Sequence, residues 1–234
     1  MLMAVFFDMF GTLAGFEPPR YDVQSQACAD FGIELTPEGV LEGYAAADRY
    51  MSEQNAVSPL RLREEKGRED FFAEYERLVL HGSGVEVTHG QAGEIWRRLG
   101  TIPHRMVAFD DVVPALTKLR ERGLTLGMIS NIDRKGAEVA QDLGIESRLD
   151  FIVTSGEVGA EKPDPVIFLA ALERAGVQPS DAVHVGDQLS SDVEGALGTG
   201  IGAVLLDRDV NHPDFNRCPR IDTMSELPPL LESY

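Results

Sequence analysis

The segment Val5-Phe6-Phe7-Asp8-Met9-Phe10-Gly11-Thr12-Leu13 places a single aspartate directly after an apolar run. A short run of valine and phenylalanine that ends before a glycine is typical of a buried strand. We therefore expect a first strand over residues 5–7, with the Asp8 carboxylate at its carboxyl end. The position two residues after Asp8 is held by Phe10 rather than by a second acid.

Apolar runs of the same kind recur after residue 105 and alternate with helix-length amphipathic segments. The expected strands are 124–130, 151–154, 182–185 and 201–206. Three helices between them have readable ends: one capped by Asp110 or Asp111 and stopping at Gly123, one from near Asp133 to Gly144, and one from Asp164-Pro165 to Gly176. Strands that alternate with helices in this way form a parallel sheet covered on both faces, so we expect an α/β core.

The segment from 15 to 101 has a helical texture with almost no strand signal. Its helix signals are starts at Thr36-Pro37 and Ser58-Pro59, a stop at Gly82, and a capping box over Thr88-His89-Gly90-Gln91. An apolar stripe typical of a helical core comprises Phe71, Phe72, Tyr75, Leu78 and Val79. We therefore expect two domains: an α/β core from 1–14 and 102–234, and a helical insert over 15–101. The joins near Pro18-Pro19 and Pro103 are candidate hinges, and a short helix is expected near 225–231.

Composition limits the partners of this protein. The formal charge of −18 argues against binding to nucleic acid or to anionic membranes, since both would be repelled. No run of eighteen apolar residues and no signal peptide are evident, so we expect neither a membrane span nor export. Cys28 and Cys218 lack metal-binding spacing and read as reduced thiols of a cytoplasmic protein.

Polar residues recur where the expected strands end. Asp8 follows the first strand, Ser130-Asn131 closes the second, Lys162 lies in the segment after the third, and Asp187 ends the fourth, with Asp192 five residues later. Ligands of open parallel sheets bind outside the carboxyl ends of the strands. Each residue alone is typical of a turn, a helix cap or a solvated charge, but their recurrence favours a common site.

The charges of this expected site complement one another. Asp8, Asp187 and Asp192 would repel one another unless a cation lies among them, and Mg²⁺ prefers such oxygen ligands. Lys162 adds a fixed positive charge, and Ser130 adds a neutral donor. Such a site suits a phosphoryl group, whose oxygens the metal and the lysine neutralise while Asp8 attacks in line.

The chain resembles the haloacid dehalogenase-like hydrolase superfamily over essentially its whole length. The resemblance rests on four motifs in order: Phe7–Leu13, Ile129-Ser130-Asn131, Glu161–Pro165 and Val185–Asp192. It implies a Rossmann-like parallel sheet with an inserted all-α cap that closes over the site and selects the substrate.

The same resemblance implies roles for individual residues. Asp8 is the nucleophile, Lys162 bridges Asp8 and the substrate, and Thr12, Ser130 and Asn131 surround the transferred group. Mg²⁺ is held by the Asp8 carboxylate, the backbone carbonyl of Phe10 and the Asp187 side chain, with Asp192 as direct or indirect support.

Phe10 is the departure from the phosphatase pattern. Phosphatases of this family carry a second aspartate there as general acid and base, and phenylalanine cannot transfer a proton. An aromatic residue resembles instead the metal-free 2-haloacid dehalogenases, in which a cap arginine such as Arg49 would bind the substrate carboxylate. The phosphonate-cleaving relatives use a cap lysine, but Lys66, the one lysine of the insert, reads as a solvated helix charge.

The three metal carboxylates have no evident use in a dehalogenase. We therefore expect a Mg²⁺-dependent hydrolase of small phosphate esters. The alternatives are a metal-free 2-haloacid dehalogenase that uses Asp8, and a binding module that has lost its activity.

Overall fold

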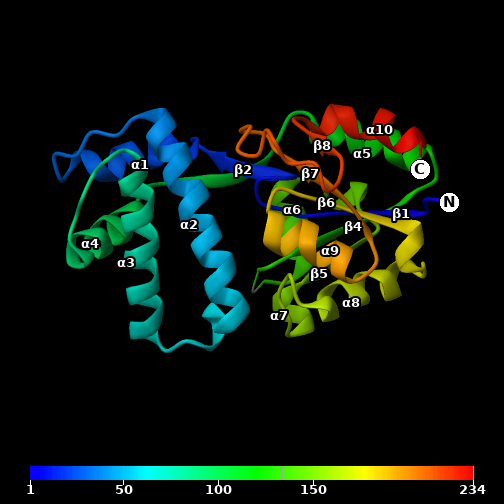
Figure 1. The fold of residues 1–234 in the computed structure, drawn as a ribbon, viewed down its shortest axis with the longest axis horizontal. Coiled ribbons are helices and arrows are strands. Elements are labelled where there is room, and N and C mark those ends of the chain that lie inside the picture. The colour runs from blue at the N-terminus through cyan, green and yellow to red at the C-terminus, as the bar shows by residue number, and fades with distance from the viewer. Residues whose placement is uncertain (133, 234) are drawn as a thin grey trace. The chain divides into compact units, whose positions relative to one another are not determined.

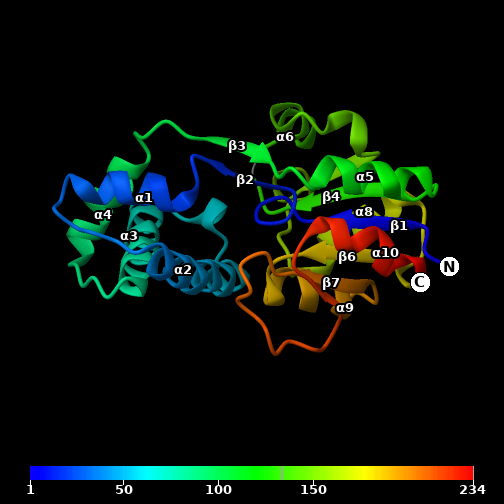
Figure 2. The ribbon, with the colours of Figure 1, turned by 90° about the horizontal axis from the view of Figure 1, so that it is seen from above.

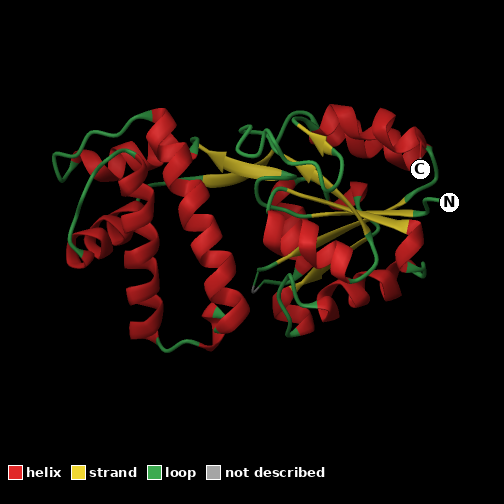
Figure 3. Ribbon diagram, in the orientation of Figure 1, coloured by secondary structure: helices red, strands yellow, loops and turns green. Residues whose placement is uncertain are grey.

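The computed structural model describes residues 1–132 and 134–233 (Figures 1 and 3). Within these residues the main sheet has six strands, in the order β5-β4-β1-β6-β7-β8. The strands are β1 (Ala4–Phe7), β4 (Thr125–Ser130), β5 (Phe151–Thr154), β6 (Ala182–Gly186), β7 (Gly202–Leu206) and β8 (Arg220–Ile221). All neighbouring pairs are parallel. This confirms the Rossmann-like α/β class, with the strand that leads to Asp8 in the middle of the sheet.

Helices cover both faces of this sheet because the side chains of each strand alternate between them. Val5 and Phe7 of β1 belong to one buried cluster, whereas Ala4 and Phe6 belong to another. The first cluster includes residues of α5 (Val112–Glu121), α6 (Gly136–Leu143) and α10 (Leu227–Leu230), and the second includes residues of α8 (Pro165–Ala175) and α9 (Gly195–Gly198). Figures 1 and 2 show α5 and α10 on one side of the strands and α8 on the other. A one-turn helix, α7 (Ser155–Val158), follows β5.

The helix ends in this unit follow the sequence signals to different degrees. Helix α8 begins as expected, since the Asp164 carboxylate accepts a hydrogen bond from Val166 N at 2.9 Å and Gly176 ends the helix in the left-handed conformation. Helix α5 begins after Asp111, but the Asp111 side chain does not cap it. Asp133, where we expected another helix to start, lies outside the described residues; α6 begins at Gly136.

The C-terminal segment departs from the single short helix expected near 225–231. It consists of a 3₁₀ turn (Met224–Glu226), α10, and a second 3₁₀ turn (Leu231–Ser233). Pro228 and Pro229 lie in the first turn of α10, where backbone N–H groups have no intrahelical acceptor and proline is tolerated.

The chain divides into two compact units, Met1–Gly15 with Met106–Tyr234, and Phe16–Arg105. Two short strands, β2 (Ala14–Glu17) and β3 (Arg105–Ala108), pair with each other where the chain passes between the units. Neither strand was predicted from the sequence, because four-residue strands carry little periodicity. An ion pair between Arg105 and Glu17 joins their ends.

The second unit is helical. Its elements are α1 (Arg20–Ala29), α2 (Pro37–Val57), a 3₁₀ turn (Leu60–Leu62), α3 (Glu65–Gly82) and α4 (His89–Leu99). Two expected starts are present: the Thr36 hydroxyl accepts from Gly39 N at 3.1 Å, and Thr88 and Gln91 form a capping box. At Ser58-Pro59, where Ser58 N donates to Gln54 O and α2 ends, only the short 3₁₀ turn begins, and the next α-helix, α3, starts at Glu65.

Helices α2 and α3 approach each other closely through glycines. A Cβ atom at Gly43 would lie 2.0 Å from Val79 O, and one at Gly82 would lie 2.1 Å from Gly39 O. The aromatic stripe of α3 packs beside this contact, with Phe71 and Tyr75 buried. Glycine is therefore required here by backbone proximity.

Among the described residues, no helix combines the length and the apolar character that crossing a membrane would need.

Candidate active site

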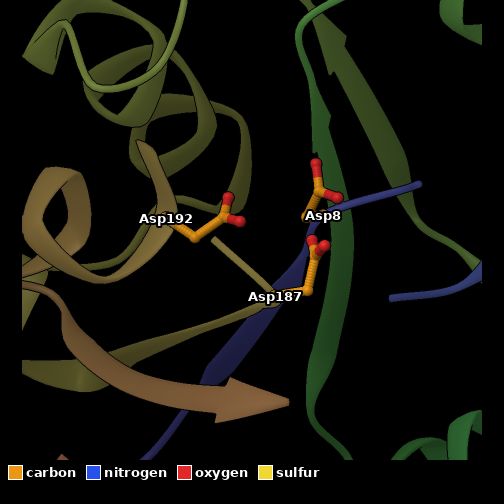
Figure 4. A group of neighbouring side chains, drawn as sticks. All are labelled: Asp8, Asp187 and Asp192. Atoms are coloured by element: carbon orange, nitrogen blue, oxygen red, sulfur yellow. The ribbon is translucent and has the colours of Figure 1, made fainter. Parts of the chain in front are cut away.

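Two aspartates lie at the carboxyl ends of adjacent central strands. Phe7 of β1 is opposite Val185 of β6, and Asp8 N donates to Val185 O at 2.8 Å. This register places Asp8 beside Asp187, which follows β6. Asp192 comes from the π-helical turn Leu189–Glu194 that begins after Gln188. The three carboxylates each offer an oxygen within 4.8 Å of the others (Figure 4).

Lys162 joins two of these carboxylates. Its Nζ donates to Asp8 Oδ1 and, at 2.6 Å, to Asp192 Oδ1. Burial alone would lower the pKa of Lys162, but the charges of Asp192 and Asp8 raise it above its usual range, so the ammonium persists. Burial raises the pKa of Asp8 to about 6, against the opposing effect of the Lys162 charge. A bound cation beside Asp8 would lower that pKa again and keep the carboxylate ionised.

Asn131 holds the backbone of Lys162. Its Nδ2 donates to Lys162 O at 3.0 Å, and its Oδ1 accepts from Lys162 N at 2.7 Å. Both ends of its amide are engaged in this contact, which leaves the second Nδ2 proton unused by it, so the expected contact of Asn131 with the transferred group stays a prediction. These two hydrogen bonds orient the loop that carries Lys162.

The Asp192 carboxylate is occupied by three donors. Oδ1 accepts from Lys162 Nζ and, at 3.0 Å, from His184 Nε2, while Oδ2 accepts from Gln188 N at 3.0 Å. Burial would raise the pKa of Asp192, but Lys162 and the His184 hydrogen bond outweigh it and hold that pKa well below its usual range. Gly186 makes room for this carboxylate, since a Cβ there would lie 2.2 Å from Asp192 Cγ.

His184 was not among the site residues predicted from the sequence. It lies in the middle of β6, is 1% exposed, and contacts the Phe168 ring edge-on at 5.3 Å. Burial lowers the pKa of His184, so a neutral ring with its proton on Nε2 donates to Asp192. A histidine inside an otherwise apolar strand was the signal available in the sequence.

The loop after β1 carries the remaining expected residues. Thr12 is buried, and its Oγ1 has no hydrogen-bond partner within the described part of the chain. Phe10 is half-buried and packs against the core cluster of β1. Gly11 adopts φ +81°, and a Cβ there would lie 2.4 Å from Asp187 Oδ2, so only glycine lets this loop pass the carboxylate. Ser130, at the end of β4, is also buried.

This donor set fits a small hard cation. Mg²⁺ takes oxygen ligands and keeps several waters, so it needs only a few oxygens from the protein. Asp8 and Asp187 point toward the same region, whereas Asp192 already accepts three hydrogen bonds (Figure 4). Asp8 and Asp187 are therefore the better candidates for direct ligands, and Asp192 for a support that holds Lys162.

Comparison with known proteins gives a consistent classification. Residues 2–200 match the family model of the haloacid dehalogenase-like hydrolases. Glyceraldehyde 3-phosphate phosphatase of Methanothermobacter thermautotrophicus is 30% identical over 249 residues, which cover 99% of this chain and 100% of that protein. Haloacid dehalogenase-like hydrolase domain-containing protein 3 of Mus musculus is 44% identical over 87 residues, but these cover only 37% of this chain and 35% of that protein.

Solved structures extend the likeness over the whole fold. A phosphatase of this family from Thermococcus onnurineus has 25% identity and a TM-score of 0.55, covering 98% of each chain. A 2-haloacid dehalogenase from Pseudomonas syringae pv. Tomato DC3000 has 25% identity and a TM-score of 0.56, covering 100% of this chain and 99% of that one. The similar structures therefore include proteins named for both reactions, and the fold alone does not distinguish the two.

Proposed function

This chain belongs to the haloacid dehalogenase-like hydrolase family and is a hydrolase, and from this premise we propose that it hydrolyses small phosphate monoesters with Asp8 as the nucleophile. The observation that carries the proposal is the Asp187 carboxylate beside Asp8, with Lys162 bound to Asp8 on the same site. A metal-free reaction at carbon has no evident use for a second acid next to its nucleophile.

In the proposed reaction each residue of the site has a separate role. One Asp8 oxygen attacks phosphorus while Lys162 holds the other; the bond from phosphorus to the ester oxygen breaks, the leaving oxygen takes a proton from water, and the phosphoryl group is carried transiently on Asp8. Water then attacks the phosphorus, the bond from phosphorus to Asp8 breaks, and inorganic phosphate leaves with the Asp8 carboxylate restored. Thr12 and Ser130 supply neutral donors to the phosphoryl oxygens. Mg²⁺, held by Asp8, Asp187 and the Phe10 carbonyl, would neutralise charge on those oxygens.

Supporting residues keep this arrangement fixed. Asp192 holds the Lys162 ammonium, and Asn131 holds the Lys162 backbone. Both contacts reduce the freedom of a long side chain whose charge must stay beside Asp8. The proposed active site thus contains a nucleophile, a fixed cation and a metal site, but no acid at position 10.

The relatives suggest a first substrate class to test. A full-length relative is named a glyceraldehyde 3-phosphate phosphatase, and a shorter match is named an N-acylneuraminate-9-phosphatase. We therefore propose a phosphorylated sugar or triose as the substrate of this chain.

Phe10 favours one competing function, a metal-free 2-haloacid dehalogenase. In that reaction Asp8 displaces halide from carbon, and halide leaves without a proton. The competing function needs neither Asp187 nor a metal, which makes the two hypotheses separable by experiment.

The test is hydrolysis of phosphate esters against Mg²⁺ concentration, run beside halide release from 2-chloropropionate. We expect Mg²⁺-dependent phosphate release that Asp8→Asn abolishes and Asp187→Ala reduces together with the metal dependence. Asp142→Asn, at an exposed ion pair with Arg134, is the matched control and should keep normal activity. Full activity of Asp187→Ala in EDTA would refute the proposal, and halide release would establish the dehalogenase instead. Mg²⁺ binding without any turnover would indicate a binding module that has lost its activity.

A further inference from the structure

Arg208 connects three segments that are distant in sequence. It follows β7, and its guanidinium donates to both carboxylate oxygens of Asp111, at 2.8 and 2.9 Å. One of these two donors, Nη2, also donates to the backbone carbonyl of Thr12 at 3.0 Å. Both side chains of the ion pair are 18% exposed, so water screens the contact only in part.

Asp111 is itself fixed from a fourth segment. Its Oδ2 accepts from Met224 N at 2.9 Å in addition to Arg208. Burial would raise the pKa of Asp111, but Arg208 outweighs this and lowers it, so Asp111 is ionised at neutral pH. This use of the carboxylate explains why Asp111 does not cap α5.

Phe109 completes the contact with the loop that follows Asp8. The Arg208 guanidinium lies over the Phe109 ring at 4.1 Å, and Phe109 N donates to Leu13 O at 3.1 Å. Two successive carbonyls, those of Thr12 and Leu13, are therefore held by Arg208 and Phe109. The ring also fills the space beside Gly15, where a Cβ would lie 2.7 Å from it.

The residue whose carbonyl Arg208 holds, Thr12, carries a side-chain hydroxyl. Thr12 is fully buried and its Oγ1 lacks a partner among the residues that the structure describes. A carbonyl held by a charged donor restrains the Thr12 backbone, and hence the direction of its Cα–Cβ bond; β-branching and burial restrict rotation about that bond. Within the described residues, no protein group competes with a substrate oxygen for this hydroxyl.

We propose that Arg208, braced by Asp111, is a positioning residue that orients Thr12 for binding the phosphoryl group of the substrate. The proposal rests on the proposed function, because it assumes that the Thr12 hydroxyl meets phosphate oxygens. Arginine is required because its planar fork reaches Asp111 with two donors while one of them also reaches Thr12. Lysine has the charge but not the fork.

A double-mutant cycle tests the coupling between Arg208 and Thr12. The variants are Arg208→Met, Thr12→Val and the combination, and the readouts are kcat, KM for p-nitrophenyl phosphate, and inhibition by inorganic phosphate. We expect Arg208→Met to weaken phosphate inhibition and kcat/KM about tenfold in the Thr12 background, as for directly coupled residues. In the Thr12→Val background the same change should have almost no effect. Arg208→Lys should recover only part of the loss.

Controls separate this role from a general loss of stability. Arg217→Met removes an exposed ion pair with Glu194 in the same unit and should leave all readouts unchanged. If Arg208→Met does not fold, Asp111→Asn replaces it in the cycle, because the amide keeps the shape and weakens only the brace. For whichever variant is used, additive effects in the two backgrounds would overturn the proposal. If Thr12→Val leaves phosphate inhibition unchanged while Asp8→Asn abolishes phosphate-ester turnover, Thr12 does not bind phosphate; the role of Arg208 is then refuted and the proposed function stands. If the native protein shows no phosphate-ester turnover, the proposed function itself is refuted.

Discussion

Glu76 should make the stability of the helical unit depend on pH. Its side chain is fully buried in α3, and its Oε1 accepts from Gln24 Nε2, which is an amide and not a cation. Its other oxygen, Oε2, has no partner in the described chain. Burial, opposed only by the Gln24 hydrogen bond, raises the pKa of Glu76 from 4.5 to about 7. The folded state therefore prefers the neutral carboxyl.

The sign and size of the effect follow from this pKa. Below about pH 4.5 both folded and unfolded states are protonated, and Glu76 contributes no pH dependence. Between 4.5 and about 7 the folded state retains a proton that the unfolded state has lost, so stability falls as pH rises. Above about pH 7 Glu76 is ionised in both states, and the unfolding free energy is lower than at acidic pH by on the order of 3 kcal/mol.

Neighbouring groups do not obscure this titration. Burial raises the pKa of Cys28 to about 12 and also raises the pKa of Tyr44, so both stay protonated between pH 5 and pH 8. Trp96, the one tryptophan of the sequence, reports on the unit because it stacks on Phe72 at 4.4 Å. Its fluorescence during urea unfolding measures the stability of this unit.

The prediction is that Glu76→Gln removes most of the fall in stability between pH 5 and pH 8. We expect the loss in the native protein to exceed that of the variant by about 2–3 kcal/mol. Glu74→Gln is the matched control on the same helix; Glu74 pairs with Arg77 and its hydrogen bond lowers the pKa of Glu74, so it stays ionised across this range. Equal pH dependence of the native protein and Glu76→Gln would show that our account of the buried carboxyl is wrong.

Three further predictions concern single positions. Phe10→Asp supplies the missing acid, and general acids of this kind contribute about 10²–10⁴-fold to the rate. Turnover of alkyl phosphates should therefore rise more than turnover of p-nitrophenyl phosphate, whose leaving group needs no proton. An unchanged preference between the two esters, with Mg²⁺ binding intact, would contradict this. His184→Leu removes one hydrogen-bond donor from Asp192, so kcat should fall about tenfold. The Mg²⁺ affinity, measured by calorimetry, should change little. Loss of Mg²⁺ binding would instead indicate that Asp192 is a ligand of the metal. Gly43→Ala forces a Cβ into Val79 O and should lower the unfolding midpoint followed by Trp96 by an amount equivalent to about 2–3 kcal/mol, while Gly90→Ala, with open space at its Cβ, should not.

Much of the fold and the candidate site follows from short-range patterns. The run of valine and phenylalanine before Asp8, the Asp164-Pro165 helix start and the Thr88 capping box each act within a few residues, so the sequence alone predicts them. The recurrence of polar residues at strand ends also places Asp8 and Asp187 together, because parallel strands end at one edge of the sheet. These features determined the α/β class and the position of the site.

Tertiary structure decided how the side chains of that site are used. The bond from Arg208 to Thr12 spans 196 residues, and the bond from Lys162 to Asp8 spans 154, so no local spacing indicates either. The sequence could not tell that Asp111 pairs with Arg208 instead of capping a helix, or that the Asp192 oxygens are already occupied. Local patterns select backbone conformation, whereas hydrogen-bond partners and burial depend on which distant segments the fold brings into contact.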